Sequence, residues 1–290
     1  MIEARHDTTL AQWITDLIRQ ICAGPENALG GAFDEPAWGA PLVGFAKGDD
    51  PLFAAYKEHV GPEHWTPAEI HALTYPDEPA PPAELSVVSW VLPQTEATKA
   101  DNRREALYLA ERWARSRVFG EQFNNSLKRQ VAEALTARGY PAVAPGISPL
   151  FKSVDSERFV YASTWSERHA AYAAGLGTFG LSDGLITPVG KAMRVGSVVV
   201  RASLPPSPRT YTDHHAYCLF YAQGTCGECI KRCPVGAITE AGHDKRLCRA
   251  HLDRSRPHVR DVYGFDGYGC GLCQAGVPCE SGIPEGLGGR

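Results

Sequence analysis

The sequence predicts an α+β protein, with a larger α/β region at residues 1–205 and a small cysteine-rich region at residues 206–290. Apolar residues with helical and strand periods alternate along the first region. Eight of the nine cysteines occur from Cys218 onward. Between the two regions, LPPSPRT (204–210) changes the composition abruptly, and we place the domain boundary there.

The composition is that of an ordinary globular protein. Hydrophobic residues make up 43% and charged residues 21%, and the formal net charge is -4, so neither disorder nor a strongly basic surface for nucleic acid is indicated. The start, MIEARHDTTLAQW, has no apolar signal core and no twin arginine, and no later stretch has the apolar length of a membrane helix. We therefore expect a cytoplasmic protein with no membrane partner, in which reduced cysteines favour metal over disulfides.

Several upstream elements follow from local patterns. Asp7 is placed to cap a helix that ends near Ala23 and carries Cys22 on its apolar face. Two capping boxes, Thr66 with Glu69 and Thr164 with Glu167, predict two further helices. The remaining expected elements are strands at 85–92, 140–144 and 194–202 and two helices at about 104–117 and 121–138, with a stop at Gly139.

The cysteine spacing predicts two iron-sulfur clusters. Bacterial-type ferredoxins use C-x2-C-x2-C-x3-C-P, in which the last cysteine ligates the other cluster. CGECIKRCP fits the last three positions, whereas the first falls on Gln223, so Cys218 is the nearest replacement. The crossover gives two sets: Cys218, Cys226, Cys229 and Cys279 for one 4Fe-4S cluster, and Cys233, Cys248, Cys270 and Cys273 for the other.

Zinc is the alternative, since C-x2-C pairs also build closed tetrahedral sites. A zinc ribbon needs no cysteine-proline turn and no interleaved extra thiols, so the pattern favours a bacterial-ferredoxin-like double-cluster module.

The loop AGLGTFG (174–180) matches G-x-G-x-x-G through Gly175, Gly177 and Gly180, which we hold as cofactor-binding candidates. A dinucleotide site would need a strand before this loop and an acidic residue about 20 positions beyond it, and neither is evident.

The segment 159–200 followed by the double-cluster module resembles the cobalamin-dependent reductases that include epoxyqueuosine reductase and the reductive dehalogenases. The resemblance covers roughly residues 85–284 and is carried by E-R-x-x-x-x-A-G-L-G, LITP, KRLC and YGCGLC. It implies a nitroreductase-like α/β N-terminal domain that holds base-off cobalamin near a cluster. It also implies that electrons pass through both clusters to cobalt.

The resemblance bears on the proton donor as well. Epoxyqueuosine reductases carry an aspartate donor in an F-V-D segment, where this chain has Phe159, Val160 and Tyr161. Reductive dehalogenases use a tyrosine assisted by a basic residue, and a nearby cation favours phenolate. Tyr161 is therefore the candidate catalytic donor, with Arg194 as its cation and Lys191 as an alternative.

The resulting hypothesis is a reductase of a small organic molecule, supplied with electrons by an external ferredoxin or flavodoxin. Because Tyr161 replaces the aspartate and little chain follows the cysteines, tRNA is not expected as a partner. The alternative function is a ferredoxin-like electron-transfer protein without cobalamin.

Overall fold

The computed structural model describes residues 8–287, and its centre is a four-stranded antiparallel sheet in the order β1-β2-β8-β3. The strands are β1 (Leu42–Lys47), β2 (Ser86–Pro93), β8 (Met193–Val200) and β3 (Ala142–Val143). The expected strands at 85–92, 140–144 and 194–202 are thus confirmed within a residue or two. Asp7, the expected cap of the first helix, lies outside the described residues.

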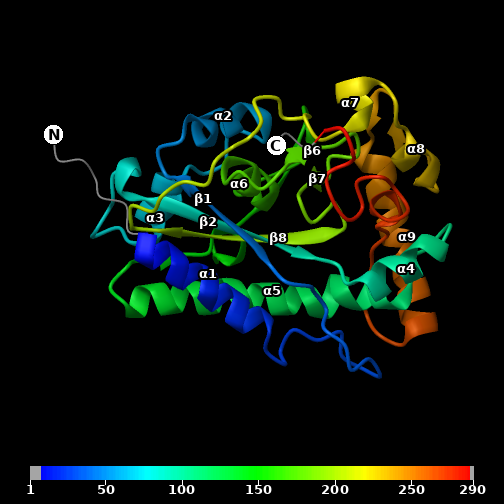
Figure 1. The fold of residues 1–290 in the computed structure, drawn as a ribbon, viewed down its shortest axis with the longest axis horizontal. Coiled ribbons are helices and arrows are strands. Elements are labelled where there is room, and N and C mark those ends of the chain that lie inside the picture. The colour runs from blue at the N-terminus through cyan, green and yellow to red at the C-terminus, as the bar shows by residue number, and fades with distance from the viewer. Residues whose placement is uncertain (1–7, 288–290) are drawn as a thin grey trace.

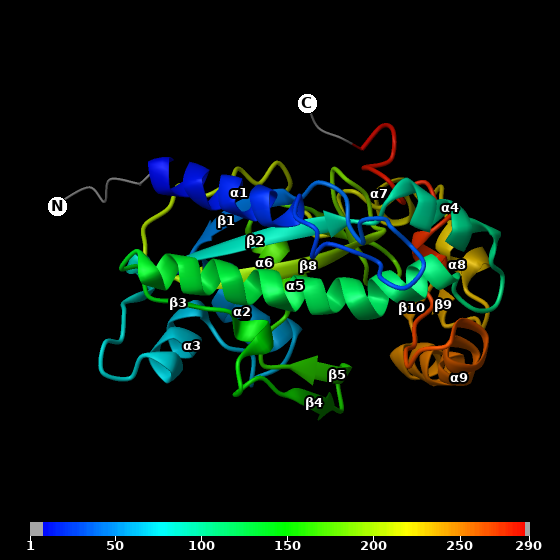
Figure 2. The same cartoon turned by 90° about the horizontal axis from the view of Figure 1, so that it is seen from below.

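Helices cover both faces of this sheet (Figures 1 and 2). One face carries α1 (Thr8–Cys22) and the long α5 (Glu111–Ala137), and the other carries α2 (Pro51–His59), α3 (Pro67–Thr74) and α6 (Glu167–Ala173). Alternate residues of β2 enter the two cores: Val87 and Val91 pack on the α6 side, and Val88 and Trp90 on the α5 side. Both faces of the central strands are therefore buried, which explains their continuous apolar sequence.

The two helices expected at 104–117 and 121–138 are in fact one, and this prediction is wrong. Gly120 lies inside α5, and a Cβ there would be 2.8 Å from the ring of Trp38. The Trp38 indole donates to the Gly120 carbonyl at 2.9 Å. The glycine serves close packing with a residue far away in the sequence and does not end the helix. A separate helix, α4 (Glu96–Arg104), precedes α5.

The two predicted capping boxes have different outcomes. Thr66 and Glu69 form theirs at the start of α3. The second box does not form, because Ser166 is the N-cap of α6 and Glu167 instead contacts Lys128 and Ser197. Cys22 is buried, as expected, and burial raises the pKa of its thiol to about 12.

The cysteine-rich segment packs at one end of the sheet (Figure 1). It holds α7 (Leu219–Gln223), α8 (Glu228–Arg232), α9 (Lys245–Tyr263) and the hairpin of β9 (Ile238–Thr239) and β10 (Gly242–His243). Two more hairpins lie nearby: β4 (Ser153–Ser156) with β5 (Val160–Ser163), and β6 (Thr178–Phe179) with β7 (Leu185–Ile186). Short 3-10 turns lie at η1 (Pro82–Glu84), η2 (Pro145–Ile147) and η3 (Leu272–Gln274).

Several bonds fix the cysteine-rich segment to the rest of the protein. Arg232 of α8 donates to four carbonyl oxygens, those of Leu272, Ala275, Glu105 and Asn102. Arg103 of α4 forms a bidentate pair with the buried Glu280. Tyr217, Cys218 and Ile238 belong to the same apolar core as the sheet strands. This continuous packing holds the cysteine loops in fixed positions against the sheet.

No helix within residues 8–287 has the length and apolar character needed to cross a membrane.

Candidate functional site

The structure brings the eight clustered cysteines together in two groups of four. A small cavity of about 20 Å³ is lined by Cys218, Cys226, Cys229 and Cys279, which we call the first cysteine set. A large cavity of about 690 Å³ is lined by Cys233, Cys248, Cys270 and Cys273, the second cysteine set. Each group has the membership given by the crossover spacing.

Backbone amides and turns shape the second cysteine set. The Ala237 amide donates to Cys233 Sγ at 3.2 Å. Gly271, between Cys270 and Cys273, has a φ of 74°. A Cβ at Gly271 would lie 2.1 Å from the Trp113 ring, so glycine lets the cysteine loop lie directly on α5. Amide donors at sulfur are the kind of interaction that stabilises thiolates bound to metal.

Burial disfavours free thiolates at both cysteine sets. It raises the pKa of Cys229 and of Cys248 to about 11, and that of Cys270 to about 12. These thiols therefore stay protonated at neutral pH unless a metal replaces the protons. Within the described residues, no group of three or more His, Cys, Asp or Glu side chains is arranged to hold a single metal ion.

Lys191 is buried between the two cysteine sets and lines both cavities. Its Nζ donates to Ser182 Oγ at 3.2 Å, and its backbone amide donates to the Cys279 carbonyl at 2.8 Å. Burial lowers the pKa of Lys191, but the nearby thiols of Cys279 and Cys273 outweigh this and raise it. The Lys191 ammonium is therefore a cation beside both cysteine sets.

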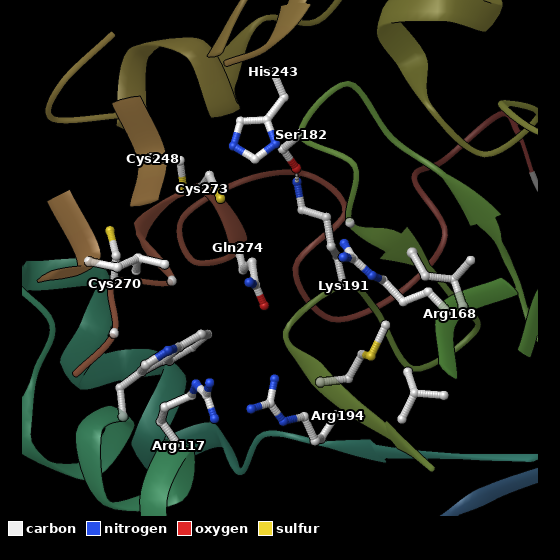
Figure 3. Close-up of a pocket in the computed structure, with 18 of the residues that line it drawn as sticks. Arg117, Arg168, Ser182, Lys191, Arg194, His243, Cys248, Cys270, Cys273 and Gln274 are labelled. Carbon is white, nitrogen blue, oxygen red and sulfur yellow. Dashed lines mark hydrogen bonds between the residues drawn. The ribbon is translucent and has the colours of Figure 1, made fainter. Parts of the chain in front are cut away.

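Charged side chains from three elements face the large cavity (Figure 3). Arg194 of β8 pairs with Glu121 of α5. Lys128 Nζ lies 3.2 Å from Glu167 Oε1 and 3.9 Å from Glu121 Oε1. The contact of Lys128 with Glu167 is an ion pair without hydrogen-bond geometry, since no donor is aimed at Glu167 Oε1 among the described residues. Glu121 holds Arg194 at the cavity wall.

A histidine and an aspartate meet at the opposite side of the large cavity. His243 Nδ1 is 3.1 Å from Asp183 Oδ2, and the imidazole lines the cavity. Burial works against the Asp183 carboxylate, but the His243 hydrogen bond and nearby cations lower the pKa of Asp183 below its ordinary value. A carboxylate-oriented imidazole is a general acid-base arrangement.

Tyr161 lies on β5 and is 45% exposed. Tyr161 is not among the residues that line the large cavity; in its segment the lining begins at Ser163 and Trp165. Asp253 raises the pKa of Arg249 on α9, and the phenols of Tyr268 and Tyr161 contribute less to the same shift. Tyr161 thus lies outside the cavity lining, whereas Arg194, its expected cation, faces the cavity and pairs with Glu121.

The backbone before Tyr161 has an unusual conformation. Val160 has a φ of 66°, and the Tyr161 amide donates to the Phe159 carbonyl at 2.8 Å, which closes a three-residue γ-turn. Positive φ at a β-branched residue is an outlier that persists only where surrounding contacts impose it. The Lys245 ammonium of α9 holds the Phe159 carbonyl at 3.2 Å.

The three glycines of AGLGTFG occupy close-packed positions. Gly175 follows α6 with a φ of 76°, and a Cβ at Gly177 would lie 2.2 Å from the Ile186 carbonyl oxygen. Gly180 lines the small cavity beside the first cysteine set. Gly175 and Gly177 let the chain turn and approach β7 closely.

Arg117, Lys128 and the pair of His243 with Asp183 were not predicted from the sequence. Arg117, Glu121 and Lys128 share one face of α5, four and seven residues apart. This spacing indicates a shared face on a single helix, but the prediction of two separate helices on either side of Gly120 concealed it.

Comparison with solved structures identifies the class of fold. The chain has the fold of epoxyqueuosine reductase: a selenomethionine-labelled example superposes with a TM-score of 0.53 at 16% identity, over 97% of this chain and 68% of that one. A catabolic reductive dehalogenase in complex with 3-bromo-4-hydroxybenzoic acid gives 0.50 at 13% identity, over 94% of this chain and 37% of that one. The mixed α and β architecture is thus shared with both kinds of enzyme.

The curated relatives that match in sequence are named epoxyqueuosine reductase. The chain is 31% identical to epoxyqueuosine reductase of Bacillus anthracis over 124 residues, which is 41% of this chain and 30% of the relative. It is 28% identical to epoxyqueuosine reductase of Staphylococcus aureus over 136 residues, which is 45% of this chain and 33% of the relative. The matches span about a third of these relatives' length, and no family model matches the sequence. The resemblance to the epoxyqueuosine reductase and reductive dehalogenase family is confirmed.

One structural neighbour corrects an expectation about partners. An epoxyqueuosine reductase solved with an epoxyqueuosine-modified tRNA-Tyr stem loop superposes with a TM-score of 0.51 at 17% identity, over 97% of this chain and 68% of that one. The prediction that tRNA is not a partner is therefore wrong: the replaced aspartate and the short stretch after the cysteines do not exclude such a ligand.

Proposed function

We propose that the protein is an iron-sulfur reductase that passes electrons through two 4Fe-4S clusters to a cobalamin in the large cavity. The observation that carries the proposal is the position of the second cysteine set, which forms one wall of a 690 Å³ cavity whose other walls come from α5, α6 and β8. A redox centre held by those thiols would lie directly beside a bound ligand.

The residues present fit the two clusters. Each cavity offers four thiols, Ala237 supplies an amide to one sulfur, and Lys191 supplies a cation between the sets. Clusters bound there would supply transfer of single electrons. The division into residues 1–205 and 206–290, with a nitroreductase-like domain followed by a ferredoxin-like module, remains part of this proposal.

The lining of the large cavity also suits part of a corrinoid in its chemistry. The cavity volume lies within the ~300–1,000 Å³ typical of cofactor sites. Gln94 and Gln274 line it, and Gln94 Oε1 is buried without a partner among the described residues. These amides and the Trp113 ring would hold the amide-bearing edge of the macrocycle. A bound corrinoid would supply a strongly reducing cobalt centre.

The chain's own residues have three tasks in such a reaction. The walls formed by Trp113, Trp165 and Met193 keep bulk water from the reacting atoms. The arginines of the cavity orient the substrate. The proposed proton donors are His243, which lines the cavity, and Tyr161, whose side chain would have to turn inward from its exposed position on β5. If the leaving group is an oxygen atom of the substrate that departs as water, the reaction consumes two electrons and two protons.

The substrate is proposed from the relatives. Epoxyqueuosine-modified tRNA is the first ligand to assay, because relatives named for that reaction include one solved with such a stem loop. A small organic substrate, as predicted from the sequence, is the second. An external ferredoxin or flavodoxin would supply the electrons.

Metal analysis of matched variants tests the proposal. Anaerobically purified protein is expected to contain about eight irons per chain, to bind added hydroxocobalamin, and to contain no stoichiometric zinc. Cys279→Ser is expected to lose the first cluster and Cys273→Ser the second, each leaving about four irons.

Zinc in place of iron would refute the proposal. Eight irons with no corrinoid binding would instead favour the electron-transfer protein, the alternative function that the cysteine sets alone support. Loss of the second cluster in Cys279→Ser would refute the crossover ligation.

A further inference from the structure

The large cavity carries an excess of positive charge. Its lining contains five cationic side chains but only two carboxylates, Glu121 and Glu167; the cations are Arg117, Lys128, Arg168, Lys191 and Arg194. The protein as a whole has a net charge of -4, so the excess is local to this site. Clefts lined with one sign of charge concentrate ligands of the opposite sign.

The two carboxylates already have partners. Glu121 pairs with Arg194, and Glu167 pairs with Lys128. No carboxylate lies within ion-pair distance of Arg117 among residues 8–287; its Nη2 donates to the Tyr268 hydroxyl at 3.0 Å, and its guanidinium stacks on the Tyr268 ring at 4.9 Å. Arg117 thus has donors left free for a ligand.

Arg117 and Arg194 approach each other at the cavity (Figure 3). Burial, followed by the charge of Arg194, lowers the pKa of Arg117 to about 10. Two neighbouring guanidinium groups of which only Arg194 has a carboxylate partner are electrostatically unfavourable until an anion joins them. The Gln274 amide points into the same space (Figure 3), and Trp113 and Met193 are apolar residues of the cavity lining.

We propose that Arg117 and Arg194 form an oxyanion subsite of the large cavity, which binds a carboxylate or phosphate group of the ligand. Planar guanidinium groups match such oxyanions through paired hydrogen bonds. The inference rests on the proposed function for the role of the cavity, and it adds the chemical class of the ligand. The oxyanion has two possible sources: the substrate, or the phosphate of the cobalamin nucleotide.

Calorimetry on the full-length, cluster-containing protein tests the subsite, with benzoate and inorganic phosphate as probes at low ionic strength. The wild type is expected to bind at least one probe, and Arg117→Gln to bind it about tenfold or more weakly. Arg129→Gln, an exposed position on the same helix outside the cavity, is expected to bind like the wild type. Arg117→Lys keeps the charge and is expected to fall between wild type and Arg117→Gln, which separates lost recognition from misfolding.

Binding of neither probe by the wild type, or equal binding by wild type and Arg117→Gln, would overturn the subsite. Cobalamin and cobinamide, which lacks the nucleotide phosphate, identify the source of the oxyanion. If Arg117→Gln weakens cobalamin binding but not cobinamide binding, the group is the cofactor's phosphate. If neither corrinoid is affected while probe binding is lost, it belongs to the substrate. Iron content measured on the same samples keeps failure of the subsite distinct from failure of the proposed function.

Discussion

Gly271→Ala should selectively damage the second cysteine set. The position has a φ of 74°, and left-handed backbone costs a non-glycine residue ~1–2 kcal/mol. The new Cβ would also lie 2.1 Å from the buried Trp113 ring, so the ring or the loop must move by roughly 1 Å, and such overpacking costs ~1–3 kcal/mol. The local penalty is therefore ~2–5 kcal/mol, concentrated on the loop that joins Cys270 to Cys273.

The matched control is Gly224→Ala. Gly224 has a φ of 66°, but a Cβ there meets no atom within 4 Å, so this variant carries only the backbone cost. We expect Gly271→Ala to fall from about eight to about four irons per chain and Gly224→Ala to keep about eight, by iron analysis and EPR. Full iron and equal thermal stability in both variants would refute the close packing of this loop on α5. Equal loss of both clusters in Gly271→Ala would refute the expectation that this substitution affects the second cluster alone.

Three further predictions concern other parts of the fold. Arg232→Lys, which loses most of four carbonyl contacts, should lower the unfolding free energy by ~2 kcal/mol in urea titrations, whereas an unchanged value would contradict its clamping role. Burial lowers the pKa of His64 to about 4, so the contribution of this residue to the unfolding free energy is present above pH ~6.5 and is lost as the pH falls toward 4. Between pH 7.5 and 5.5, the unfolding free energy of the wild type should fall by ~1.4 kcal/mol more than that of His64→Gln, and an equal fall would contradict this. Tyr161→Phe should lower turnover by ~100-fold or more while leaving iron content and corrinoid affinity unchanged, and undiminished turnover would exclude Tyr161 as the donor.

How far the sequence predicts the structure depends on how local each signal is. The strands β2 and β8 are continuous apolar runs, and the Thr66 capping box lies within four residues, so local patterns identify them. The cysteine spacing likewise predicts the two groups that the structure brings together. The continuity of α5 depends on Trp38, which contacts Gly120 across 82 positions, and no local pattern reveals such a contact.

The cavity was harder to predict for the same reason. Its cations come from three elements that meet only in the folded chain, and Glu167 leaves its expected capping role because Lys128 and Ser197 are close in space. Tyr161 was selected from its neighbours in sequence, and the structure adds a strained turn at Val160 that those neighbours do not predict.

The backbone bonds between the start of β8 and the last cysteine loop have a consequence for how the protein is made. The amides of Lys191 and Ala192 donate to the carbonyls of Cys279 and Glu280, so the loop that carries Cys279 is attached to the central sheet. The final geometry of the first cysteine set therefore depends on residues about ninety positions earlier, directly before β8. If the proposed clusters are bound, assembly of the first one would be coupled to folding of the sheet, and a ribosome-bound chain that lacks this loop would expose unligated thiols to oxidation.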